Sequence, residues 1–164
     1  ANGRAVVHFT KMLPYAGTPI ARQLKEEGKL EGTIDYPTYR YRDSRLNLME
    51  AFLVKTFHEA IFGKLALVNK LRMLIFDVEV IKKFYPEKYN LAEYAESIKE
   101  AATRYNESAI ETIELALKFM RKHSYEDILY YWSVLEYLTQ QELSAQSKVD
   151  KTISTLTPRT LKKA

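Results

Sequence analysis

Arginines and tyrosines alternate in a short stretch near the N-terminus, residues 35–45, which reads DYPTYRYRDSR. An arginine fork can bind a phosphate through two hydrogen bonds, and a tyrosine can stack on a base or donate its hydroxyl. The stretch could therefore contact a nucleic-acid backbone. In the alternative interpretation it is a strand-like loop whose tyrosines pack on the rest of the protein and whose arginines are solvated. Both interpretations stay open at the level of the sequence.

Charge is distributed unevenly along the 164 residues, whose net charge is +4. Residues 1–45 hold eight Lys and Arg against five Asp and Glu, whereas residues 86–147 hold six against eleven. Residues 46–85 carry a net +2 and residues 148–164 a net +4. Clustered Lys and Arg attract polyanions, and a basic arm can follow a phosphate backbone while releasing counterions. No base-reading module is evident, so we expect nucleic-acid binding to be independent of sequence.

Residue patterns that support catalysis or metal binding are missing. The chain has no cysteine, which excludes disulfides, thiolate nucleophiles and thiolate metal sites. The residues three positions before the histidines are Ala5, Lys55 and Met120, so the Glu-x-x-His pairs of di-iron bundles are absent. No phosphate-binding glycine loop, dinucleotide fingerprint or zincin motif is present. We therefore expect a protein that is not an enzyme, with no catalytic residues, no metal site and no cofactor.

Hydrophobic periodicity predicts long helices and no sheet. Thr18 as an N-cap, Pro19 at the first helical position and Gly28 at the end predict a short helix over residues 18–27. Apolar residues at three- and four-residue steps predict further helices over 44–83, 91–123 and 124–147, with Gly63 as the natural bend in the first. No window approaches 18 unbroken apolar residues, so we expect no membrane-spanning helix.

These elements predict an all-α fold, an elongated bundle of about three long helices. The bundle is expected over residues 44–147, after an extended basic N-terminal arm over residues 1–43 that contains the short helix. A basic C-terminal tail is expected over residues 148–164. An unbroken helix over 44–83 would be about 60 Å long, so either this helix bends or the fold is elongated.

The chain resembles the major capsid proteins of rod-shaped and filamentous archaeal DNA viruses. The resemblance lies in a small N-terminus reading Ala-x-Gly-Arg (Ala1, Gly3, Arg4), a long basic arm with a helix that begins at Pro19, and a cysteine-free helical bundle. The rod-shaped viruses have shorter proteins with less charge in the bundle, so this sequence looks closer to the enveloped filamentous branch.

The resemblance implies a structural protein of the virion, assembled in the host cytoplasm. The subunit would pair with itself or with a paralogous capsid protein and wrap its arm and helices around double-stranded DNA, held in A-form within a helical nucleocapsid. For the enveloped branch, a lipid envelope around the filament is a further candidate partner. The candidate nucleic-acid-binding residues are Arg4, Lys11, Arg22, Lys25, Lys29, Arg40, Arg42, Arg45, Tyr39 and Tyr41.

Two other functions fit the same observations. A cellular, chromatin-like helical protein would bind nucleic acid with the same basic ends but would form no filaments. An adaptor bundle would bind protein partners through its acidic surface, with its basic ends as mere tails, and would show no salt-dependent affinity for DNA. An enzyme with an unfamiliar site has no residues to nominate.

Overall fold

The computed structural model describes residues 3–64, 66–86 and 91–156 of the chain. These residues are mostly helical, which confirms the all-α class. The elements in chain order are α1 (Pro19–Glu26), β1 (Leu30–Gly32), β2 (Pro37–Tyr39), α2 (Ser44–Ile61), α3 (Leu67–Phe84), α4 (Ala92–Lys122), α5 (Tyr125–Tyr130) and α6 (Trp132–Thr155).

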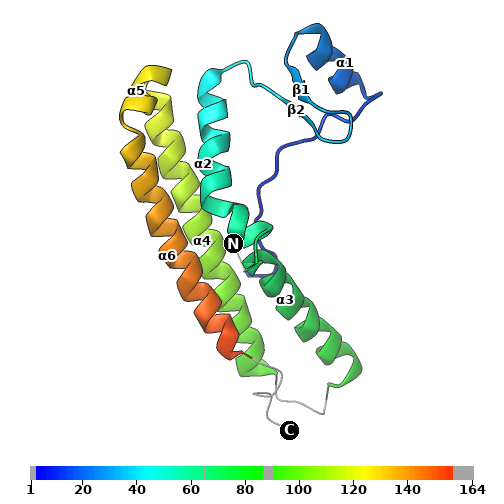
Figure 1. Cartoon of the computed structure of the whole chain (residues 1–164). Coiled ribbons are helices and arrows are strands. Elements are labelled where there is room, and N and C mark those ends of the chain that lie inside the picture. The colour runs from blue at the N-terminus through cyan, green and yellow to red at the C-terminus, as the bar shows by residue number, and fades with distance from the viewer. Residues whose placement is uncertain (1–2, 65, 87–90, 157–164) are drawn as a thin grey trace.

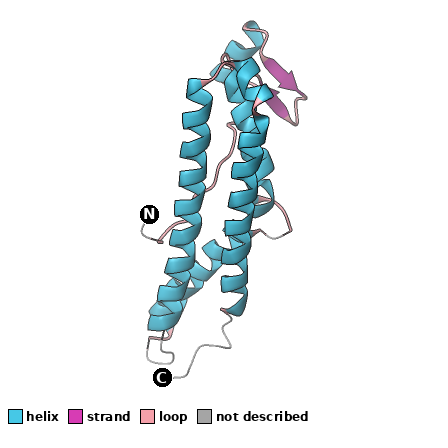
Figure 2. Cartoon of the chain, turned by 90° about the vertical axis from the view of Figure 1, so that its left-hand side faces the viewer, coloured by secondary structure: helices cyan, strands magenta, loops and turns pink. Residues whose placement is uncertain are grey.

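The helices form an elongated bundle around a long antiparallel pair, α4 and α6 (Figure 1). α2 and α3 follow one another along this pair, α2 beside one half of its length and α3 beside the other half. Figure 2 shows the long axis of the bundle from a second direction, with α1 and the two strands gathered at one end. The segment that holds α1, β1 and β2, residues 19–39, therefore lies near the N-terminal end of α2.

The helix expected over 44–83 is broken close to the glycine that was expected to bend it. α2 ends at Ile61 and α3 begins at Leu67. Gly63 donates its backbone N–H to the carbonyls of His58 and Glu59, and Ala66 lies in the left-handed region with a φ of 39°. The two helices run in the same direction on either side of this break, and both pack against α4.

The third long helix begins where it was expected, but it is divided near its start and ends later than expected. α5 is a short helix with a capping box formed by Ser124 and Asp127, and it is followed by α6, which runs to Thr155. Val149 and Ile153 are buried against the rest of the bundle, so the helix continues past residue 147. The start of the tail is therefore corrected from 148 to 156, and residues 157–164 lie outside the described residues.

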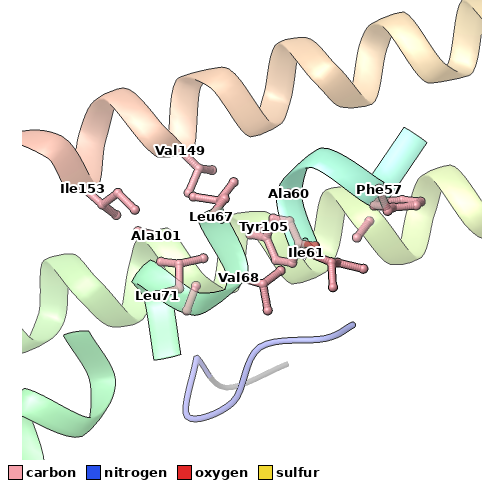
Figure 3. Close-up of a cluster of buried hydrophobic side chains, with 12 residues drawn as sticks. Phe57, Ala60, Ile61, Leu67, Val68, Leu71, Ala101, Tyr105, Val149 and Ile153 are labelled. Atoms are coloured by element: carbon pink, nitrogen blue, oxygen red, sulfur yellow. The ribbon is translucent and has the colours of Figure 1, made fainter. Parts of the chain in front are cut away.

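The main core cluster lies beneath the break between α2 and α3 (Figure 3). It brings together side chains from four helices: Phe57, Ala60 and Ile61 of α2, Leu67, Val68 and Leu71 of α3, Ala101, Ala102, Tyr105 and Ala109 of α4, and Val149 and Ile153 of α6. The hydrophobic core therefore stays continuous across the break, because the ends of both helices contribute to one cluster.

A chain of polar side chains crosses the bundle beside this core. Glu142, only 1% exposed, accepts hydrogen bonds from the hydroxyls of Ser108 at 2.5 Å and Thr112 at 3.2 Å and from the Gln146 amide at 3.0 Å. Gln146 also donates to the backbone carbonyl of Thr56 at 3.2 Å. Burial raises the pKa of Glu142 above its ordinary value of 4.5. The network joins α2, α4 and α6 at a fixed register.

Candidate nucleic-acid interface

The predicted arm contains a small folded unit, residues 18–45, which we call the arm module. α1 buries Ala21 and Leu24 and lies against β1. Thr18 caps the helix through its hydroxyl, which accepts from the Ala21 amide at 3.3 Å, as the sequence predicted. The helix spans Pro19–Glu26, within a residue of each expected end.

The two strands correct the expectation that the chain has no sheet. β1 and β2 pair antiparallel, with Leu30 opposite Tyr39 and Gly32 opposite Pro37. Gly32 has a φ of 80°, and any side chain there would collide with the carbonyl of Tyr36. The turn between the strands presents Ile34 and Tyr36, both strongly exposed. About half of the stretch 35–45 is therefore part of a hairpin rather than of an extended arm.

Lys11 fastens the arm module to α2. Its ammonium donates to the Tyr39 carbonyl and to Glu50 Oε2, each at 2.7 Å. It also lies 4.6 Å and 5.0 Å from the ring centroids of Tyr39 and Tyr41, within the range of cation–π attraction. The two rings meet edge to face at 5.2 Å, and burial raises the pKa of Tyr41 to about 12. These three candidates are thus engaged with one another inside the chain.

Carboxylates of the same segment hold most of the other candidate cations. Glu27 accepts from Lys29 at 2.8 Å and from the Arg42 guanidinium, and these bonds lower the pKa of Glu27 to about 2, Arg42 contributing most. Arg40 pairs with Glu31 at 2.6 Å, on the hairpin.

Arg45 pairs with Asp43 at 2.7 Å, and the Asp43 carboxylate also accepts from the Arg45 amide as the N-cap of α2. These bonds lower the pKa of Asp43. Its carboxylate therefore serves both the helix terminus and a candidate cation.

Two cations of the arm module have no carboxylate partner within the part of the chain described here. Arg22 and Lys25 lie three residues apart on α1 and are both exposed, whereas Ala21 and Leu24 of the same helix are buried. Arg40 and Arg42 are also accessible despite their ion pairs, with 65% and 73% of their side chains exposed. These four side chains are the ones that an approaching polyanion would meet first.

Arg4 lies apart from the other candidates. It lines an open cleft of about 1000 Å³ between α3 and α4, together with Lys82 and Lys99. The chain after it is held to α4 by Asn106, whose amide accepts from the Val7 N–H at 2.9 Å and donates to the Ala5 carbonyl at 2.8 Å. Residues 3–9 of the expected arm are therefore docked on the bundle.

The structure thus gathers part of the predicted site and divides the rest. Arg22, Lys25, Lys29, Arg40 and Arg42 belong to one module, Lys11, Tyr39, Tyr41 and Arg45 lie where that module joins α2, and Arg4 lies on the bundle. Tyr36 at the hairpin turn is not among the residues predicted from the sequence, although it stands in the same stretch, residues 35–45. A turn flanked by two short strands would have singled it out.

Comparison with known proteins gives no assignment: no family model, curated protein or solved structure matches the chain. Among the described residues, no three His, Asp or Glu side chains are grouped so that they could hold a metal ion. Within the same residues, no helix combines the length and apolar character needed to cross a membrane.

Proposed function

We propose that this chain is a structural nucleic-acid-binding subunit, the major capsid protein of a filamentous archaeal virus, which assembles into a helical filament around double-stranded DNA. Its partners would be the DNA and either a second copy or a paralogous capsid protein, and a lipid envelope is a further candidate. The protein would act in the virion after assembly in the host cytoplasm, and it would catalyse no reaction.

The observation that carries the proposal is the set of accessible cations on a module that projects beside the bundle (Figure 1). Arg22 and Lys25 have no carboxylate partner among the described residues, and the side chains of Arg40 and Arg42 stay exposed in their ion pairs. Exposed ion pairs contribute little to stability, about 0–1 kcal/mol each. A phosphate can therefore replace Glu31 at small cost, or bind the exposed Arg42 beside Glu27, and accept hydrogen bonds from the guanidinium.

Few contacts in each subunit are enough for a filament. When many copies bind one duplex, the lattice multiplies weak phosphate contacts into stable attachment. Such contacts need no base recognition, in agreement with the lack of a base-reading element. The exposed Tyr36 at the hairpin turn adds an aromatic surface next to the arginines.

Arg40→Gln combined with Arg42→Gln tests the proposal in a DNA-binding assay. We expect the affinity for a fluorescent 30-base-pair duplex to fall by about tenfold at low salt, and the slope of log affinity against log salt to decrease by about two. Arg104→Gln is the matched control, because Arg104 is an equally exposed arginine paired with a carboxylate, on α4. An equal loss of DNA affinity in both variants, or no loss in either, would contradict the assignment of DNA binding to the arm module.

A second candidate, the protein-binding adaptor, is favoured by one specific observation. The arm module holds six Lys and Arg against five Asp and Glu, and most of its cations are already paired. If these pairs persist in solution, the module presents little net charge to a polyanion. This function predicts no salt-dependent affinity for DNA in the same assay.

A further inference from the structure

The outer face of α3 carries an apolar stripe that no other helix or strand covers among the described residues. Met73, Phe76 and Phe84 are 60%, 61% and 62% exposed, and Val80 between them is half-buried. At about 100° per residue, this stripe lies on the side of the helix opposite Leu71 and Val78, which face the bundle. α3 thus has two apolar sides, one packed on the bundle and one facing outward. An exposed apolar side is typical of an interaction surface.

Charged residues flank the stripe in an ordered way. Arg72 and Glu79 lie on one flank, seven residues apart, and neither has a hydrogen bond or an ion pair within the described part of the chain. Lys70 and Asp77 lie on the other flank with the same spacing, and Lys70 is held by Asp150 at 2.8 Å. Each flank therefore places a cation toward the N-terminal end of α3 and an anion toward its C-terminal end.

We propose that α3 pairs antiparallel with α3 of a second copy of this chain, about a two-fold axis. In the register that packs Met73 against the partner's Phe76, Asn69 lies opposite the partner's Val80, and Phe84 lies beyond the N-terminal end of the partner's α3. An antiparallel pair aligns like flanks, so Arg72 meets the partner's Glu79 twice, once in each direction.

The charges select this arrangement over the parallel one. In the antiparallel pair, all four charged positions meet an opposite charge, because Lys70 also faces the partner's Asp77. A parallel pair would bring only Arg72 beside the partner's Asp77 and would place Glu79 next to the partner's Phe84. Because Lys70 already has a partner in its own chain, the Arg72–Glu79 contacts are the decisive ones.

The pairing deepens the proposed function, on which its role in assembly rests. One pair of helices forms a small interface, so the free dimer should be weak and should strengthen when nucleic acid or further copies add contacts. The dimer itself can be measured without nucleic acid. Its failure is therefore distinct from a failure of the proposed function.

A charge exchange across the two-fold axis tests the proposal by analytical ultracentrifugation of the full chain. Arg72→Glu and Glu79→Arg should each weaken the dimer by about tenfold or more, because two attractions become two repulsions. An equimolar mixture of the two variants should dimerise at least as well as the wild type, since every contact is then between opposite charges. Lys118→Glu, an exposed charge reversal on α4, is the matched control and should change nothing.

Cross-linking tests the direction of the helices independently of charge, and the chain helps because it has no cysteine. Asn69→Cys mixed with Val80→Cys should form a disulfide-linked heterodimer. Asn69→Cys alone should not cross-link, because antiparallel pairing separates the two copies of position 69 by about 16 Å along the axis. Efficient cross-linking of Asn69→Cys alone, together with none in the mixture, would overturn the antiparallel arrangement.

Further outcomes separate the two proposals. A wild-type chain that stays monomeric at high micromolar concentration, single charge variants that dimerise normally, or a mixture that fails to dimerise would each overturn the α3 pairing. Phe76→Ser should abolish the dimer and leave the affinity of the arm for a short duplex unchanged. Loss of the dimer with DNA binding retained supports the pairing, whereas a dimer without any DNA binding contradicts only the proposed function.

Discussion

Leu71, Ala102 and Ile128 of the bundle have no exposed surface, whereas the arm module buries few apolar side chains, among them Ala21, Leu24 and Pro37. The bundle is thus held by apolar burial among long helices. The module is held to α2 by the Lys11 ammonium and within itself by ion pairs at the surface. Ion pairs at the surface can be exchanged for contacts with another charged molecule, as the proposed binding of a polyanion by the arm requires.

The two regions also shift the pKa of a carboxyl group in opposite directions. In the bundle, burial among neutral hydroxyl and amide donors raises the pKa of Glu142. In the arm, Arg42 and Lys29 lower the pKa of Glu27 to about 2. One region therefore favours a neutral acid and the other a charged one, so that a change of pH acts on them with opposite sign.

The largest expected difference is in global stability. Leu71→Ala should lower the free energy of unfolding by about 2–5 kcal/mol, because it opens a cavity in the main core. Leu24→Ala should lower it by less than about 1 kcal/mol, because the arm module can open locally while the bundle stays folded. Urea denaturation followed by the fluorescence of Trp132, which lies in the bundle, measures both. Equal losses would mean that arm and bundle fold as one unit.

Lys11→Met should loosen the arm while sparing the bundle. The substitution keeps most of the aliphatic volume but leaves the Tyr39 carbonyl and Glu50 without the ammonium. We expect the free energy of local opening to fall by about 1–2 kcal/mol, seen as faster hydrogen exchange across residues 30–39. Lys25→Met is the control, because Lys25 has no such contacts among the described residues, and an identical effect of both variants would refute the fastening role.

The free energy of unfolding of the bundle should depend on pH above pH 4.5. Because the folded-state pKa of Glu142 lies above its ordinary value of 4.5, folding takes up a proton, and stability decreases as the pH rises from 4.5 through the folded-state pKa. Glu142→Gln removes this titration. As the pH rises, the unfolding free energy of the wild type should therefore fall relative to that of the variant. A difference between the two that is constant with pH would show that Glu142 is not the titrating group.

The arm should respond in the opposite direction. The stabilising effect of the charged Glu27 is present above pH 4.5 and is lost as the pH falls toward about 2. Hydrogen exchange across residues 30–39, corrected for the intrinsic rate, should therefore speed up between pH 4.5 and 2.5. Glu27→Gln should show the loosened arm at every pH, and an unchanged pH response in that variant would show that Glu27 is not the group responsible.

Local signals were enough to predict most helices of this chain, but not the division of the third long helix into α5 and α6. Thr18, Pro19 and Gly28 marked the ends of α1, and Gly63 marked the break between α2 and α3. The hairpin escaped prediction because each strand is only three residues long, too short for an alternating pattern. The end of α6 was placed too early because Lys148 and Lys151 suggested a solvated tail, although Val149 and Ile153 continue the buried stripe.

The contacts of the candidate site depend on tertiary structure, and this is why the sequence could not define them. Lys11 and Glu50 are 39 residues apart, and nothing local indicates that a hairpin brings Tyr39 between them. Glu142 is different, because it shares the helical phase of Leu135, Thr139 and Val149, all buried. A polar residue in such a phase predicts a buried network, and that signal was available in the sequence.

Negative-stain electron microscopy of the purified protein with and without linear double-stranded DNA, at low and at high salt, tests the central proposal most directly. We predict regular filaments that require DNA and dissolve at high salt, with Arg40→Gln/Arg42→Gln forming fewer of them than Arg104→Gln. Discrete particles with salt-sensitive DNA binding would point instead to the chromatin-like function. Images unaffected by DNA would contradict the account and favour the adaptor.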